Sequence, residues 1–204
     1  MKISQMKSGN PFLFLLFTCV LSMGVLFSAS AQNGPGKRKA GAAAKVKASE
    51  TVVYLVRHAE KAASNGNMTD DPDLSEAGQK RAEVLKTKFA AAPVAALFAT
   101  KYKRTQQTLQ PLATTLQQTV QIYDARDFTS LVEKIKKEYA GKTVVVAGHS
   151  NTVLSLLEAL GGKKPFTEIA DYQYDYLFKV TLREGKETQV DVQQYGQAST
   201  ATAN

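Results

Sequence analysis

Residues 51–60 read TVVYLVRHAE, an apolar and β-branched run that stops abruptly at Arg57 and His58. Residues 51–56 have the composition of a buried strand, which places the Arg-His pair on the loop at its carboxyl end. Open α/β sheets bind their ligands outside that end of their strands. This stretch therefore predicts both a fold class and the edge of the sheet where a site forms.

A second apolar run, VVVAG at residues 144–148, leads directly into His149, and the chain has only these two histidines. If the two strands lie parallel in one sheet, both histidines open from the same edge. Together with Arg57 they form a cationic pocket able to hold a phosphate. For a single histidine, a hydrogen-bonded loop residue is the simpler interpretation; for two histidines placed alike, we favour a functional site.

The N-terminal 31 residues have the pattern of a secretory signal peptide. Lys2 and Lys7 form a basic start, an almost wholly apolar stretch follows, and ASA at residues 29–31 supplies a cleavage site. We expect cleavage near Ala31 and an exported protein, periplasmic or secreted. The alternative is an uncleaved anchor, although the apolar stretch is shorter than the roughly 20 residues of a spanning helix. Membrane contact is expected only in that case.

The only cysteine, Cys19, lies inside this segment, so the mature chain has neither a disulfide nor a thiol nucleophile. That excludes cysteine proteases, thiol phosphatases and cysteine-based zinc sites. Residues 32–50 follow, with five basic residues, one acid and no apolar period, and they predict a flexible basic linker.

The net charge of +8 is unevenly distributed along the chain. Residues 51–204 carry nineteen basic and seventeen acidic residues, so most of the excess, +6 of the +8, belongs to the N-terminal 50 residues. A nearly neutral folded part gives no reason to expect a nucleic-acid partner.

Strand-like and helix-like segments alternate four times after residue 50. We expect strands at residues 51–56, 94–99, 120–123 and 142–147, each followed by an amphipathic helix. Residues 175–182 and 188–194 are predicted to form a hairpin instead. The fold expected for residues 51–196 is a three-layer αβα sandwich, with a mostly parallel sheet and an antiparallel edge hairpin. Residues 197–204 are polar and predicted to be a disordered tail.

The loops after the first, second and fourth strands carry most of the chain's candidate site residues. They are Arg57, His58, Lys103, Arg104, His149, Ser150 and Asn151. Guanidinium groups present paired donors to phosphate oxygens, and a neutral imidazole is a nucleophile toward phosphorus. The helix that begins after His149 adds free N–H groups, which favour an anion. The set predicts phosphate binding and phosphoryl transfer.

Four motifs resemble the histidine phosphatase superfamily, in its phosphoglycerate-mutase-like branch. They are LVRHAE at 55–60, LSEAG at 74–78, YKRTQQT at 102–108 and VAGHSN at 146–151. They follow the family's order and span residues 51–195. The resemblance implies a phosphoglycerate-mutase-like fold and transient phosphorylation of His58. It also implies that Arg57, Arg104 and His149 clamp the phosphoryl group, that water releases phosphate, and that no metal or organic cofactor takes part.

The compact domain is similar to the small phosphohistidine-phosphatase-like members and lacks the long insertions of the mutases. This resemblance implies a phosphoric monoester hydrolase that acts on a small phosphorylated substrate or a phosphorylated protein.

A leaving alkoxide needs a proton, and a general acid contributes about 10²- to 10⁴-fold in rate. Relatives often carry a carboxylate just after the third strand, where this chain has Asp124 and Asp127. Asp124 is the better-placed candidate for the acid, with Glu60 and Asp70 as alternatives. Since the family's acid is more often a glutamate, this position departs from the pattern. Without an acid, good leaving groups such as acyl phosphates, phosphohistidine or aryl phosphates would be preferred.

Three other functions remain open from the sequence. A phosphoglycerate-mutase-type phosphoryl transfer uses the same pocket, but export and short loops weigh against it. A non-catalytic phosphate-binding module does not need a nucleophile. A two-histidine metal site lacks a recognisable ligand spacing.

Overall fold

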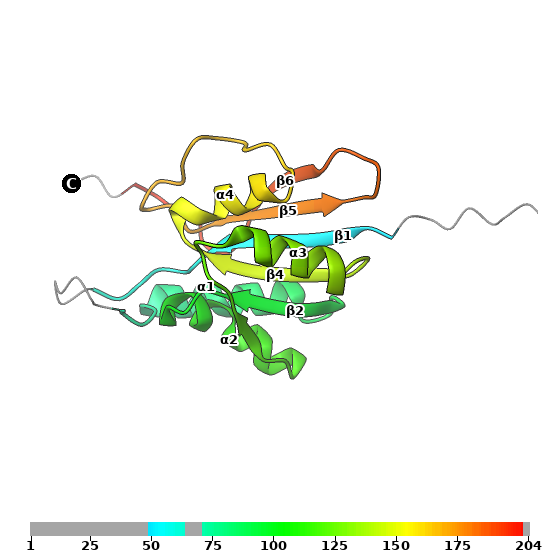
Figure 1. Cartoon of the computed structure of the whole chain (residues 1–204). Helices are drawn as coiled ribbons and strands as arrows, with labels where there is room; N and C mark the ends of the chain where they lie inside the picture. Colours follow the sequence, from blue (N-terminus) through cyan, green and yellow to red (C-terminus); the bar gives the residue numbers. More distant parts are fainter. Residues whose placement is uncertain (1–48, 64–70, 202–204) are drawn as a thin grey trace, which may run out of the picture. The chain divides into compact units, whose positions relative to one another are not determined.

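The computed structural model describes residues 49–63 and 71–201. The predicted signal peptide, linker residues 32–48 and the candidate acid Asp70 lie outside this range. Six strands and four helices are present within it (Figure 1). The strands are β1 (Thr51–Arg57), β2 (Val94–Ala99), β3 (Val120–Ile122), β4 (Thr143–Gly148), β5 (Tyr176–Leu182) and β6 (Gln189–Gln194). The helices are α1 (Glu76–Phe89), α2 (Lys103–Leu116), α3 (Phe128–Glu138) and α4 (Ser150–Ala159).

The strands form one sheet in the order β3-β2-β4-β1-β5-β6. The pairs β1 with β4, β4 with β2, and β2 with β3 are parallel. Strand β5 runs antiparallel to both β1 and β6, which confirms the predicted edge hairpin. The two most apolar strands, β1 and β4, are neighbours inside the sheet, so the segments that precede the two histidines lie side by side.

The helices cover the sheet on both faces, which confirms the three-layer αβα sandwich. On one face, Leu55 of β1 belongs to a core cluster with residues of α3 and α4 such as Ile135 and Leu157. On the other face, Val56 of β1 packs in a cluster with Leu85 of α1 and residues of α2. The side chains of β1 thus serve both cores, as expected for a strand buried on both sides.

Helix α1 begins after Ser75, whose side chain caps it by accepting a hydrogen bond from the Gly78 backbone N–H at 3.2 Å. A Cβ atom at Gly78 would lie 2.1 Å from the carbonyl oxygen of Glu60. Glycine therefore lets α1 approach the loop that leaves β1. Helix α2 continues through Pro111. No helix among the described residues has the length and apolar character needed to cross a membrane.

Two details differ from the sequence-based expectation. Arg57 is the last residue of β1, opposite Gly148, and does not lie on the loop. The backbone ladder extends one residue beyond the apolar run because pairing depends on main-chain groups.

The second difference concerns the tail that was expected to be disordered from residue 197. The Gln197 carbonyl accepts a hydrogen bond from Arg81 at 2.8 Å, and Ser199 bonds to Tyr174 and Asp175. Its first residues therefore have defined partners that composition alone did not reveal.

Candidate active site

The two histidines leave paired ends of neighbouring strands. Arg57 lies opposite Gly148 in the parallel ladder, and the His58 backbone N–H donates to the Gly148 carbonyl at 2.9 Å. The register therefore places His58 beside His149, with 5.4 Å between the ring centroids. The sequence prediction that both histidines open from one edge of the sheet is confirmed.

His58 is held in one tautomer by the main chain. Its Nδ1 lies 2.8 Å from the Ala59 carbonyl oxygen, which can only accept a hydrogen bond. Nδ1 therefore carries the proton and Nε2 carries the lone pair. Burial, reinforced by the positive charges of Arg57 and Arg104, lowers the pKa of His58 to about 3. The ring is neutral at pH 7, as a nucleophile must be.

Arg57 is oriented by the loop that precedes β5. Its Nη1 donates to the backbone carbonyls of Ala170, Asp171 and Gln173 at 2.8, 3.0 and 3.2 Å, and its guanidinium lies 4.3 Å from the ring centre of Tyr174. The Nε atom is buried and has no hydrogen-bond partner among the described residues. A buried donor of this kind is costly, so it favours an anion as its partner.

Arg104, in the first turn of α2, is held between an acid and an imidazole. Its Nη1 donates to Asp71 Oδ1 at 3.2 Å, and its Nη2 lies 3.5 Å from His149 Nδ1. Asp71 also accepts from the Lys103 backbone N–H at 3.0 Å. The side chain of Lys103 is exposed, so only its main chain takes part in this arrangement.

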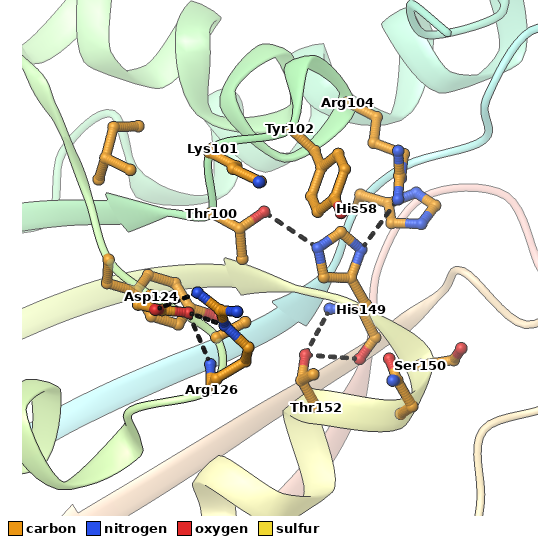
Figure 2. A pocket seen from close by; sticks show the side chains of 14 residues that line it. His58, Thr100, Lys101, Tyr102, Arg104, Asp124, Arg126, His149, Ser150 and Thr152 are labelled. Carbon is orange, nitrogen blue, oxygen red and sulfur yellow. Dashed lines mark hydrogen bonds and ion pairs between the residues drawn. The ribbon is translucent and has the colours of Figure 1, made fainter. Parts of the chain in front are cut away.

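A cavity of about 760 Å³ opens beside these groups (Figure 2). His58, Arg104 and His149 line it together with Ser150 and Asn151 from the start of α4. Ser150 begins α4, and the N-terminus of a helix favours an anion. Of the predicted site residues that the structure describes, Arg57 and Lys103 do not line this cavity.

Asp124 lines the cavity but has the wrong environment for a general acid. It forms two hydrogen bonds to the Arg126 side chain, at 3.0 and 3.2 Å, and its carboxylate is exposed (Figure 2). The Arg126 contacts hold the pKa of Asp124 below its ordinary value. A general acid needs a raised pKa so that it carries its proton at pH 7.

The alternative acids that the structure describes also have other partners. Glu60 forms a bidentate ion pair with Arg81, with Nη2 and Oε1 2.7 Å apart. Asp127 caps α3 by accepting from the Ser130 N–H at 3.1 Å. Asp124 is thus the only carboxylate that lines the cavity within the described residues, and it is ion-paired. Nor do these residues contain a cluster of three or more His, Cys, Asp and Glu side chains suited to a metal ion.

Sequence reasoning missed several residues of the site. Thr100 bonds to His149, Asp71 orients Arg104, and Tyr174 stacks on Arg57. Thr100 carried one usable signal, because it directly follows a predicted strand at the same edge of the sheet. Asp71 and Tyr174 lie on loops whose path no periodic pattern predicts.

Comparisons with known proteins agree with this geometry. The model of the histidine phosphatase superfamily (branch 1) matches residues 53–127. A search of curated proteins gave no match.

Among solved structures, a mycobacterial glucosyl-3-phosphoglycerate phosphatase, Rv2419c, is 12% identical and covers 72% of this chain and 100% of its own, with a TM-score of 0.59. The protein histidine phosphatase SixA, in complex with tungstate, is 17% identical and covers 71% of this chain and 96% of its own, with a TM-score of 0.56. YhfR of Bacillus stearothermophilus is 15% identical and covers 70% of this chain and 96% of its own, with a TM-score of 0.56.

At these identities the solved structures establish the fold, and the family match covers the first histidine motif and the Arg104 motif. In the structure His149 lies beside His58 and Arg104, as the sequence predicts. The chain therefore shares the fold of these solved phosphatases, and over residues 53–127 it is similar to the histidine phosphatase superfamily (branch 1).

Proposed function

We propose that the protein is an exported phosphatase that hydrolyses phosphomonoesters or related phosphoryl compounds through a phosphohistidine on His58. The observation that carries the proposal is the tautomer of His58, whose Nδ1 is bonded to the Ala59 carbonyl at 2.8 Å. Nε2 is thereby left unprotonated beside His149 and near the positive charge of Arg104.

In the first step, Nε2 of His58 attacks phosphorus as the bond from phosphorus to the leaving group breaks. Water then attacks phosphorus, the P–N bond breaks, and inorganic phosphate leaves. Arg104 and the start of α4 supply hydrogen bonds and positive potential where the equatorial oxygens gather charge, and His149 orients Arg104. Phosphoryl transfer is accelerated mainly by positioning and charge of this kind.

The environment of Asp124 points to a class of substrate. Arg126 keeps this carboxylate ionised, and no other carboxylate of residues 49–63 and 71–201 lines the cavity, so within this part of the chain the leaving group has no strong acid to help it depart. Phosphohistidine, acyl phosphates and aryl phosphates satisfy that condition better than alkyl esters. We propose such compounds, small or attached to a protein, as the substrates.

Turnover of p-nitrophenyl phosphate by the purified full-length protein, without added metal, tests the activity. We expect hydrolysis by the wild type, none by His58→Ala, and wild-type activity for Lys80→Ala, which changes an exposed side chain of α1. Equal activity of wild type and His58→Ala would reject the proposal.

Leaving-group dependence tests the substrate class. We expect kcat/KM to fall steeply from acetyl phosphate and aryl phosphates to glycerol phosphate, as leaving-group basicity rises. A flat dependence would mean that an acid protonates the leaving group.

Export is proposed from the N-terminal sequence alone. Mass spectrometry of the protein recovered from a bacterial periplasm should find Gln32 as the first residue. Replacing the cleavage-site Ala31 with Phe should leave the segment attached. A mature N-terminus at Met1 in the wild type would contradict cleavage.

A further inference from the structure

A chain of buried hydroxyl groups leads from the second strand end to His149. Thr100 follows β2, is 2% exposed, and its Oγ1 lies 3.0 Å from His149 Nε2 (Figure 2). Thr105, in the first turn of α2, is fully buried, and its Oγ1 lies 2.9 Å from that of Thr100. Water has little access to this chain, so the hydroxyl groups bond to one another and to the protein.

The directions of these hydrogen bonds follow from their partners. Thr105 Oγ1 lies 2.8 Å from the Tyr102 carbonyl and 3.1 Å from the Thr100 carbonyl, and both carbonyls only accept. The Thr105 hydroxyl therefore donates to a carbonyl and accepts from the Thr100 hydroxyl. With its single proton used in this way, Thr100 Oγ1 can only accept from His149.

His149 Nε2 must then carry the proton, and Nδ1 the lone pair. The other side of the ring gives the same answer independently, since Nδ1 faces Nη2 of Arg104 at 3.5 Å and a guanidinium only donates. Asp71 holds the other terminal nitrogen of Arg104 at 3.2 Å. The arginine is therefore fixed at two points, one of which depends on the tautomer of His149.

We propose that Thr100 and Thr105 are positioning residues that hold His149 in its Nε2–H tautomer and, through its Nδ1 lone pair, orient the Arg104 guanidinium. The two histidines of the chain are then opposite tautomers, since His58 carries its proton on Nδ1. The kinetic consequence rests on the proposed phosphatase function, whereas the tautomers do not.

Nitrogen-15 NMR of the full-length protein with labelled histidine tests the tautomers directly, because the chain has only two histidine rings. At pH 7 we expect one Nδ1–H ring and one Nε2–H ring. Spectra of His58→Gln assign the remaining signal to His149. Two rings of the same tautomer, or an Nδ1–H tautomer at His149, would overturn the proposal.

Variants of Thr100 test the function of this relay, by which we mean the hydrogen bonds that link Thr105 through Thr100 to His149. Thr100→Val removes the hydroxyl and should give a mixture of His149 tautomers. It should also lower kcat by about 10- to 100-fold, by analogy with the loss of the outer hydrogen-bond partner of a metal-bound histidine. Thr100→Ser keeps the hydroxyl and should restore both the tautomer and most of kcat.

Thr51→Val is the matched control, since it removes another buried hydroxyl with one backbone partner, Gly141, at the opposite end of β1. It should change neither the spectrum nor kcat.

A Thr100→Val protein that keeps the pure Nε2–H tautomer would overturn the relay, whatever its activity. If Thr100→Val does not fold, the spectra of the wild type and of Thr100→Ser still show whether His149 is the Nε2–H tautomer. Opposite tautomers in a wild type without phosphatase activity would reject the proposed function and leave the relay intact.

Discussion

At the scale of single residues, the site contains one buried imidazole, His58, and one half-buried imidazole, His149, both kept neutral by their surroundings. Burial together with nearby arginines lowers the pKa of His58 to about 3 and that of His149 to about 4. The positive charges of Arg57 and Arg104 thus help to keep His58, the proposed nucleophile, unprotonated.

This arrangement predicts the acid side of the pH profile. A histidine with its ordinary pKa of about 6.5 would lose roughly 30-fold in neutral fraction at pH 5. Because the pKa of His58 is lowered to about 3, the ring stays neutral there and kcat/KM should hold nearly level from pH 7 to pH 5. The measurement is kcat/KM for p-nitrophenyl phosphate, corrected for the ionisation of the substrate. A fall with an apparent pKa near 6.5 would show that His58 titrates normally.

Asp124 gives a second prediction at this scale. Since it is ionised and paired with Arg126, Asp124→Asn should change kcat/KM for alkyl and aryl phosphates by the same small factor. Arg126→Ala is the companion variant, because it frees the carboxylate without removing it. A selective loss of about tenfold or more on alkyl esters in Asp124→Asn would restore Asp124 as the general acid.

The residues that sequence reasoning found and those it missed differ in a physical way. His58 and His149 follow strongly apolar strands, and that pattern fixes their place at the sheet edge. The place of Asp71 and Tyr174 depends on loop paths, which lack a period. Whether Asp124 is an acid depended on Arg126, two residues away, whose side-chain direction the sequence does not specify.

At the scale of elements, α1 joins the nucleophile loop to the C-terminal segment. Arg81 of α1 is 4% exposed, holds Glu60 at both carboxylate oxygens, and donates to the carbonyls of Tyr195 and Gln197 at 2.7 and 2.8 Å. The segment it holds reaches Ser199, whose Oγ accepts from the backbone N–H of Tyr174. Because Tyr174 stacks on Arg57, the C-terminal segment supports the site indirectly.

Arg81→Met should therefore destabilise the domain strongly. The substitution leaves the Glu60 carboxylate and two carbonyls without their donor, which should lower the free energy of unfolding by about 3 kcal/mol. We do not expect a larger loss, because the Glu60 side chain is 23% exposed and water can partly replace the donor. Lys80→Ala, which breaks an exposed pair with Glu76 on the same helix, should cost at most about 1 kcal/mol. Urea unfolding measures the free energy of unfolding of both variants, provided that the m-value is unchanged. Equal losses in the two variants would mean that Arg81 does not anchor the segment.

The sequence predicted every helix and strand of the described domain, with small shifts at their ends. Serine is a favoured N-cap residue, so the start of α1 at Ser75 carries a local signal. The connection made by Arg81 carries no such signal, because a buried arginine on an amphipathic helix looks like any exposed one until its partners are placed.

At the scale of the whole molecule, strand order brings distant segments to one edge. The order β3-β2-β4-β1 places the loops after β1, β2 and β4 next to one another, although they are separated by about ninety residues between His58 and His149. The alternation of strands and helices predicted this convergence, since right-handed crossovers leave few other arrangements. The natural substrate was not predictable, because exposed residues such as Lys101 and Arg126 form the outer wall of the cavity.

Trapping the phosphoenzyme shows whether the phosphoryl group passes through His58. Full-length protein is mixed with p-nitrophenyl phosphate, quenched in alkali, where phosphohistidine survives, and digested for mass spectrometry. We predict one phosphate on the peptide that contains His58, formed within the first turnover and absent from His58→Ala. Turnover without any phosphorylated histidine, or phosphate found on His149 instead, would contradict the account.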